Sequence, residues 1–232
     1  MMTNSEFVAK VKDIADNYKT LYVMGCFGSP MTAANKKRFC DNHAFNRASE
    51  RRAMINAADG DTFGFDCVNL IKAILWGWRG DKSHIYGGAK YASCGVPDVS
   101  ADGMIKLCNG VSNDFSGIAV GEAVWTDGHI GVYIGGGLAV ECTPKWDNCV
   151  QVTAVGNIGK KSGYNTRTWK KHGKLPWVEY KPLSKSEEIA GYIEVLRKAG
   201  VITEVAKWQK KAEADSDIYW LLRKTAGKMS GR

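Results

Sequence analysis

The sequence predicts an α+β fold, on two observations about the order of its segments. The chain has mainly helical segments first and a meander of strand-like segments after them, an order typical of the α+β class. After Pro182 the periodicity is helical throughout. A chain of 232 residues is long enough for one domain with an appendage. We therefore expect an α+β domain over residues 1–180 and a small helical domain over residues 181–232.

The composition is that of a globular protein, with 44% hydrophobic residues, 24% charged residues and 5 Pro. Lys and Arg outnumber Asp and Glu by 32 to 24, and the charge of +8 favours polyanions such as nucleic acid, anionic lipid or anionic cell wall. The most continuous apolar run, residues 68–78, is too short and too interrupted to span a membrane. The first twenty residues lack the apolar core of a secretory signal peptide.

The first 59 residues are predicted to form a helix, a strand and a helical insertion. Thr3 and Glu6 have the spacing of a capping box before an amphipathic helix. Residues 21–30 have the pattern of one short apolar strand that runs into glycines. Residues 32–59 are basic and rich in alanine, and we expect an insertion of two short helices broken near His43.

The centre of the chain is predicted to contain a buried helix and an antiparallel meander. A loop over residues 60–64 leads to a helix that begins at Cys67 and is apolar on more than one stripe, which implies burial. Two β-rich segments flank Asp127-Gly128, and a third follows the turn at residues 135–137, as consecutive hairpins require.

The remaining segments are assigned by periodicity and capping signals. We expect a short helix over residues 100–107 within a long connection, and strands over residues 150–155 and 164–169. Ser184 and Glu187 form a second capping box, and two further helices fit residues 204–214 and 216–226. The expected apolar anchors of the last two helices are Trp208, Tyr219, Trp220 and Leu222.

The seven cysteines form an odd set without a CxxC pair, which favours reduced thiols over disulfides or a paired zinc site. Most of them are expected to be small buried residues, but Cys67 lies at a helix start, where unpaired backbone N–H groups favour a thiolate and can hold an oxyanion. His43, His84 and His172 have the context of solvated surface residues. His129 instead begins a strand, and Glu141 on the next strand is predicted to lie roughly opposite it, within reach of its ring.

Three segments, YVMGCFG, FGFDCVNLIKAILWGW and GHIGVYIGGGLAVECTP, resemble in order the signature blocks of NlpC-type papain-like cysteine peptidases. The resemblance covers residues 21–180 and implies a papain-like domain, with the nucleophile at the start of a central helix packed on an antiparallel sheet. It implies that Cys67 is the nucleophile, that His129 is the base which later protonates the leaving amine, and that Glu141 orients the imidazole. No metal or cofactor is implied.

Three further residues are candidates for oxyanion or substrate binding. Tyr22 matches the tyrosine of the first block, which implies a place near the oxyanion. Asp66 matches an acidic residue that can bind the free amine of a stem peptide, although an Asp at a helix start is also a common cap. Trp125 is either a platform for the substrate or ordinary strand packing.

The narrower resemblance is to the endopeptidase domains of endolysins from phages and prophages of clostridia and related Firmicutes. It implies cleavage of peptidoglycan after γ-D-glutamate, synthesis in the host cytoplasm and release through a holin. A CHAP-like N-acetylmuramoyl-L-alanine amidase and a catalytically silent wall-binding protein remain alternatives. The partner is then peptidoglycan, with anionic wall polymers as a second candidate, rather than nucleic acid or a membrane interior. The helices after residue 180 are either a wall-binding module or a surface for homo-oligomer assembly.

Overall fold

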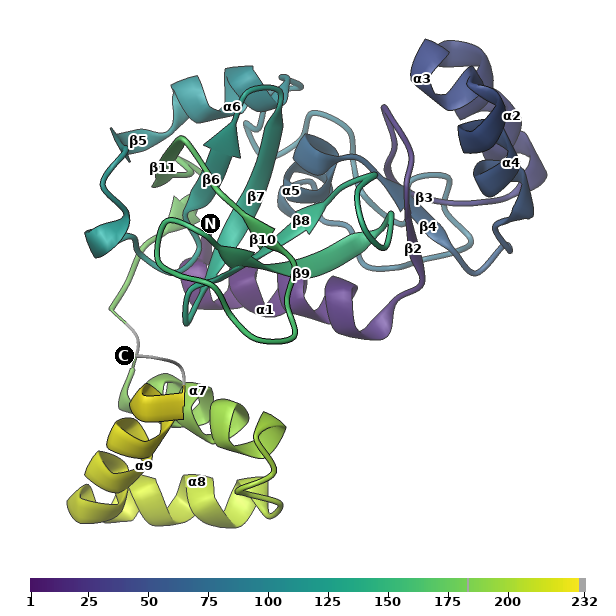
Figure 1. Cartoon of the computed structure of the whole chain (residues 1–232). Coiled ribbons are helices and arrows are strands. Elements are labelled where there is room, and N and C mark those ends of the chain that lie inside the picture. The colour runs from purple at the N-terminus through teal and green to yellow at the C-terminus, as the bar shows by residue number, and fades with distance from the viewer. Residues whose placement is uncertain (183, 230–232) are drawn as a thin grey trace. The chain divides into compact units, whose positions relative to one another are not determined.

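The computed structural model describes residues 1–182 and 184–229, which divide into two compact units after Tyr180 (Figure 1). The first unit mixes helices with strands, so the predicted α+β class is confirmed. Its helices are α1 (Asn4–Asn17), α2 (Ala33–Asn42), α3 (Ala44–Arg47), α4 (Ser49–Ala57), α5 (Cys67–Leu75), α6 (Ala101–Leu107) and the short 3-10 helix η1 (Phe115–Gly117). Its strands are β1 (Met2–Thr3), β2 (Thr20–Tyr22), β3 (Phe27–Pro30), β4 (Phe63–Phe65), β5 (Asn109–Ser112), β6 (Ala123–Thr126), β7 (His129–Gly135), β8 (Leu138–Cys142), β9 (Val150–Val155), β10 (Thr166–Arg167), β11 (Lys171–Lys174) and β12 (Val178–Glu179).

A seven-stranded sheet with the order β10-β9-β8-β7-β6-β11-β5 forms the centre of the first unit. Strand β10 runs parallel to β9, and the other neighbours are antiparallel. The predicted hairpins β6–β7 and β7–β8 are confirmed. Glycines with positive φ form their turns, Gly128 in the first hairpin and Gly135–Gly137 in the second. Strand β5 and the pairing of β11 were not predicted, because these short segments lack an alternating pattern.

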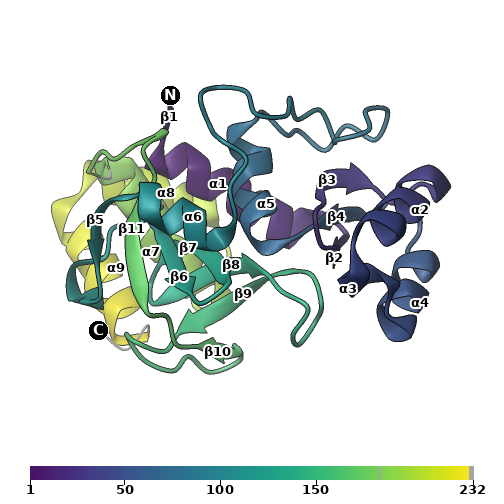
Figure 2. The same cartoon turned by 90° about the horizontal axis from the view of Figure 1, so that it is seen from above.

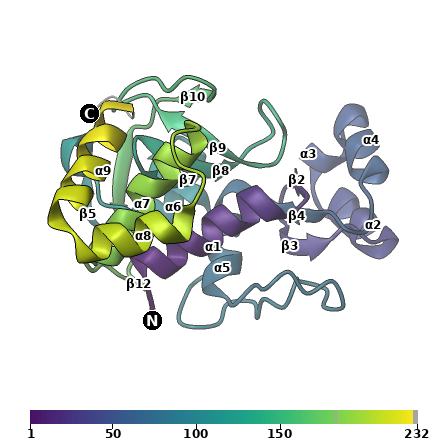
Figure 3. The same cartoon turned by 90° about the horizontal axis from the view of Figure 1, so that it is seen from below.

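Helices α1 and α5 pack on one face of this sheet and on each other (Figure 3). The capping box of Thr3 and Glu6 starts α1 as predicted, and Phe7, Val11 and Ile14 form its buried stripe. Every residue of α5 is buried, because one side of the helix packs on β7 and β8 while others pack on α1 and β3. The predicted central helix is therefore confirmed.

A second, three-stranded sheet with the order β2-β4-β3 lies beside the start of α5. The sequence analysis predicted one strand over residues 21–30 and a loop over residues 60–64, so its assignment here was wrong in part. The reason is Gly64, where an added Cβ would lie 2.7 Å from Met31 Cε and 2.9 Å from Cys26 Sγ. This glycine allows close packing of β4 between its neighbours and does not mark a loop.

The basic insertion forms three helices, α2 to α4, beyond this small sheet (Figure 2). The predicted break at His43 is confirmed, and a second break at Ala48 divides the remainder. The insertion is anchored by Arg51, which donates hydrogen bonds to the Tyr22 carbonyl and to the Asn148 side chain. Asn148 lies in the β8–β9 connection, which reaches toward α3 in Figure 2. The insertion is thus tied to segments that adjoin the start of α5.

The second unit consists of α7 (Lys185–Lys198), α8 (Val205–Ala214) and α9 (Ser216–Met229) within its described residues. The capping box of Ser184 and Glu187 is confirmed, and Leu222 is buried as predicted. Trp220 was expected to be an apolar anchor, but it is 49% exposed and lies under the Arg223 guanidinium at 4.9 Å. Across residues 1–182 and 184–229, none of the helices combines the length and apolarity that a bilayer crossing requires.

Candidate active site

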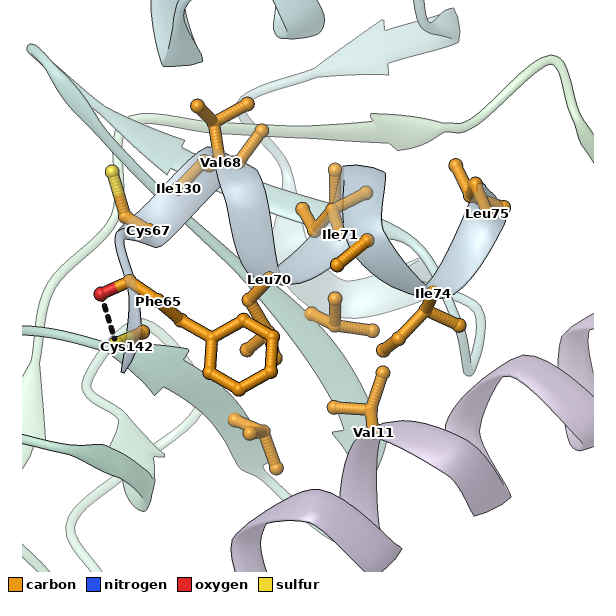
Figure 4. Close-up of a cluster of buried hydrophobic side chains, with 14 of the residues drawn as sticks. Val11, Phe65, Cys67, Val68, Leu70, Ile71, Ile74, Leu75, Ile130 and Cys142 are labelled. Carbon is orange, nitrogen blue, oxygen red and sulfur yellow. Dashed lines mark hydrogen bonds between the residues drawn. The ribbon is translucent and has the colours of Figure 1, made fainter. Parts of the chain in front are cut away.

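Cys67 is the first residue of α5, as its sequence context predicted. Asp66 caps the helix, because its Oδ1 accepts a hydrogen bond of 2.8 Å from the Asn69 N–H. The Cys67 sulfur points away from the apolar cluster that contains Phe65 and Cys142 (Figure 4). The cap and the apolar packing of α5 together fix where the sulfur lies.

The Cys67 thiol is buried, and only 8% of the residue is exposed. Its sulfur lies 4.0 Å from the carbonyl oxygen of Gly128, the residue before His129. Burial, and next to it the charge of Asp66, raise the pKa of Cys67 to about 12, although the N–H groups of Ile130 and Val68 oppose the rise. The N–H groups at the helix start thus favour the thiolate, as expected, but burial and the charge of Asp66 outweigh them. The thiol needs a base to take its proton.

His129 is the candidate for that base. Its Nε2 lies 2.6 Å from Glu141 Oε2, and a carboxylate can only accept a hydrogen bond, so Nε2 carries a hydrogen and, in the neutral ring, Nδ1 carries the lone pair. Nδ1 has no hydrogen-bond partner among the residues that the structure describes. The ring stacks on Trp169, with 5.6 Å between centroids and 11° between planes. Two contacts thus hold the ring, and neither of them involves Nδ1.

Glu141 reaches His129 diagonally, which differs from the predicted position opposite it. Val132 pairs with Val140, so the register places Glu141 two residues along from the position across from His129. The side chain crosses beside Gly131, where an added Cβ would lie 3.2 Å from Glu141 Cβ and 2.9 Å from the Val140 carbonyl oxygen. The missing side chain at Gly131 therefore allows the contact. The predicted pair is brought together, by a register that the sequence did not show.

The Glu141 carboxylate has no exposed surface and is surrounded by donors. Thr153 Oγ1 donates to Oε1 at 2.7 Å, and Arg167 Nε lies 2.9 Å from Oε1 and 2.7 Å from Oε2. Burial acts to raise the pKa of Glu141, but the hydrogen bonds and charges of His129 and Arg167 outweigh it, so its pKa lies below the ordinary value. Glu141 is thus ionised at neutral pH and accepts the hydrogen on Nε2.

Thr153, Arg167 and Trp169 were missed by the sequence analysis. Thr153 breaks the apolar pattern of β9, and this polar position was the available signal for a buried partner. The contacts of Arg167 depend on β10 lying parallel to β9, a pairing that periodicity cannot reveal.

Tyr22, which the resemblance places near the oxyanion, is close enough to Cys67 for the charge of its thiolate to act on the phenol. It is buried at the end of β2, where desolvation and the charge of a Cys67 thiolate both raise the pKa of its phenol. Its hydroxyl contacts Met24 Sδ at 3.8 Å, and its ring meets Phe45 of α3 edge-on at 5.8 Å. Tyr22 therefore links the small sheet and the insertion to the candidate nucleophile.

The polar groups of Asp66 and Trp125 are occupied by other parts of the chain. Asp66 Oδ2 accepts from the Gly25 N–H at 2.8 Å and from Asn69 Nδ2 at 2.7 Å, which supports the capping role. Trp125 Nε1 donates to Asp102 Oδ1 at 2.9 Å, and the same oxygen accepts from the Gly128 N–H at 2.8 Å. Asp102, which the sequence analysis missed, thereby holds the turn that carries Gly128 toward the sulfur.

His172 was predicted to be a solvated surface residue, and that prediction was wrong. Only 5% of it is exposed, because Nδ1 pairs with Glu122 and Nε2 lies 2.9 Å from the Asp114 carbonyl oxygen. The pair ties β11 to the segment before β6. His84 is exposed as predicted and pairs with Asp81 at 2.8 Å.

In the part of the chain that the structure describes, His, Cys, Asp and Glu form no group of three or more suited to a metal ion. All seven cysteines are free, and five of them are buried, as most were expected to be.

No protein-family model matches the chain, and no curated protein matches it either.

Proposed function

We propose that this protein is a peptidoglycan hydrolase that cleaves an amide bond of the stem peptide through Cys67, His129 and Glu141. One observation carries the proposal: Glu141 holds the His129 ring at 2.6 Å through Nε2, directly after Gly128, whose carbonyl oxygen lies 4.0 Å from the Cys67 sulfur at the start of α5. A nucleophile, a base and a residue that orients the base are the parts that covalent amide hydrolysis requires. The resemblance to NlpC-type peptidases supplies the substrate class.

The proposed reaction has two stages. The thiol proton moves from Cys67 Sγ to His129 Nδ1 as the sulfur attacks the amide carbon, and the N–H groups at the start of α5 donate hydrogen bonds to the developing oxyanion. The imidazolium then gives its proton to the leaving amine, and a thioester on Cys67 remains. Water attacks the thioester while His129 accepts a proton from it, and the imidazolium then returns that proton to the leaving Cys67 sulfur, which releases a carboxylic acid and the free thiol.

The bond proposed for cleavage is the one after γ-D-glutamate, on the resemblance to clostridial phage endolysins. Mass spectrometry of purified walls digested by the full chain tests this choice. A new free amine on a stem-peptide residue, with the amide between sugar and peptide intact, is the expected product. Cleavage of the sugar–peptide amide would instead establish the alternative, an N-acetylmuramoyl-L-alanine amidase.

A Cys67→Ala variant separates the hydrolase from a silent wall-binding protein. We expect it to fold and to release no peptide, because the nucleophile is absent. Cys108→Ala is a matched control, since Cys108 is equally buried and belongs to no part of the site. Wall lysis by Cys67→Ala at the wild-type rate would contradict the mechanism.

Wall polymers are the proposed partners, and the charge of +8 suits their anionic groups. Release to the wall through a holin belongs to the same proposal and rests on the resemblance. Binding to purified walls across a salt series should weaken steeply if the basic side chains attract the wall. Deletion of residues 181–232 tests whether the helical unit binds the wall or assembles copies of the chain. The affinity for the wall would fall in the first case, and the number of chains per particle in solution would fall in the second.

A further inference from the structure

The buried carboxylate of Glu141 is held by Arg167 as well as by His129. Arg167 Nη2 lies 2.7 Å from Glu141 Oε2 and 3.2 Å from Thr143 Oγ1, in addition to the two contacts of Nε. Only 12% of the Arg167 side chain is exposed, and none of the Glu141 side chain. The two charges therefore face each other where solvent screens them little.

Two indole rings hold the Arg167 guanidinium in place. Its central carbon lies 5.0 Å from the Trp146 ring centroid and 5.5 Å from that of Trp169, which are cation–π distances. The backbone of Trp169 is itself fixed, because the Asn157 side chain accepts a hydrogen bond of 2.8 Å from its backbone N–H and donates one of 2.9 Å to its backbone carbonyl. Since Trp169 also stacks on His129, one ring contacts both the cation and the imidazole.

We propose that Arg167 is a positioning residue that cancels the charge of Glu141, so that the carboxylate orients the His129 ring as part of an electrically neutral pair. An unbalanced carboxylate beside an imidazole stabilises the imidazolium, and a proton held too tightly is given up slowly to a leaving amine. With Arg167 in place, Glu141 keeps its geometric role without that effect. The inference rests on the proposed function only in taking Cys67 and His129 as the reacting pair.

The charged groups around the ring allow a count that predicts how variants behave. Glu141 on β8 and Arg167 on β10 cancel, while Asp66, which precedes Cys67 at the start of α5, adds a negative charge that none of the variants below removes. The uncharged Thr153 of β9 completes the surroundings of the carboxylate. Removing Arg167 leaves one negative charge in excess, and removing the charge of Glu141 leaves one positive charge.

The test is the pH dependence of Cys67 alkylation by iodoacetamide in the full chain, read on the Cys67 peptide by mass spectrometry. Arg167→Met should raise the midpoint by roughly one pH unit or more, because a lost positive charge makes nearby groups hold protons more tightly. Glu141→Gln should lower the midpoint for the opposite reason. The variant carrying both substitutions should return close to the wild-type midpoint, and Arg167→Lys should stay nearer to it than Arg167→Met.

Arg79→Met is the matched control, because it removes an exposed guanidinium outside this cluster and should leave the midpoint unchanged. The proposal is overturned if the double variant stays displaced like either single variant, since Arg167 would then act through packing alone. If Arg167→Met does not fold, the fall in Glu141→Gln and the return in the double variant still decide. Alkylation requires no wall substrate, so the two proposals can fail separately. If the alkylation midpoints shift as predicted but the protein does not hydrolyse cell walls, the proposed function is rejected and this inference stands.

Discussion

Single residues around the Cys67 sulfur differ in what they contribute. His129 is the proposed base and Glu141 fixes its ring. The positions of both depend on neighbouring residues that take no part in the proposed reaction. Gly131 is such a neighbour, since the Glu141 side chain and the Trp169 ring meet where its side chain would stand. Gly131 does not have a positive φ, so these side-chain contacts, and not the backbone conformation, require glycine at this position.

Gly131→Ala tests this reading of the register. The added Cβ would lie 2.9 Å from the Val140 carbonyl oxygen and 3.1 Å from Trp169 Cη2, so Glu141 and Trp169 must shift. We expect the free energy of unfolding to fall by about 1–3 kcal/mol, as for other overpacked positions, and turnover to fall further as the ring loses its support. Urea unfolding and the rate of wall hydrolysis measure the two effects.

Gly60→Ala is the control for that substitution, because nothing lies within 4 Å of its added Cβ. It should leave both quantities close to wild type. Wild-type turnover in Gly131→Ala would mean that the Glu141–His129 contact is not needed.

The elements differ in how much of their placement the sequence reveals. Helices α1, α5 and α7 carry their own start signals, and their first residues were predicted to within a residue or two. The strands around Gly64 and the diagonal contact to His129 were not predicted, because they depend on close approach between chains and on register. The candidate residues could thus be named from local pattern, whereas Arg167, Trp169 and their contacts depend on long-range pairing that local pattern does not encode.

The start of α5 offers a test of the two roles of Asp66. Asp66→Asn keeps an oxygen for the cap but removes a charge that raises the pKa of Cys67. Cys67 should therefore be alkylated by iodoacetamide at lower pH than in wild type, with a loss of about 1–2 kcal/mol of stability where Nδ2 faces the Gly25 N–H.

Asp114→Asn is the matched control, since Asp114 caps η1 and should leave the Cys67 alkylation unaffected. If Asp66→Asn weakens substrate binding while the pH dependence of alkylation stays unchanged, Asp66 acts as a substrate ligand rather than as a cap near the sulfur.

At the scale of the whole first unit, buried thiols make stability depend on alkaline pH. Desolvation is the main cause that raises the pKa to about 12 for Cys26, Cys67 and Cys108 and to about 11 for Cys149, against an ordinary value of 9.0. An unfolded chain loses these protons near pH 9, whereas the folded chain retains them. Stability is therefore full below pH 9 and falls as the pH rises toward 12.

The expected loss is roughly 1.4 kcal/mol per pH unit for each such thiol. Urea unfolding in reducing buffer at pH 7.5 and pH 10 measures it. Cys108→Ala should lessen the difference between the two values, and Cys94→Ala should not, because Cys94 is exposed. Equal stability at both pH values would contradict the burial of these thiols.

The most direct measurement is of the bond that Cys67 is proposed to form. Full-length protein mixed with a stem peptide, quenched in acid and mapped by mass spectrometry, should carry the acyl group as a thioester on the Cys67 peptide. The adduct should be absent from His129→Ala, which lacks the base, and from Cys67→Ala. Hydrolysis of the peptide by Cys67→Ala, or turnover by the wild type with the acyl group on another residue, would contradict the assignment of this sulfur as the nucleophile.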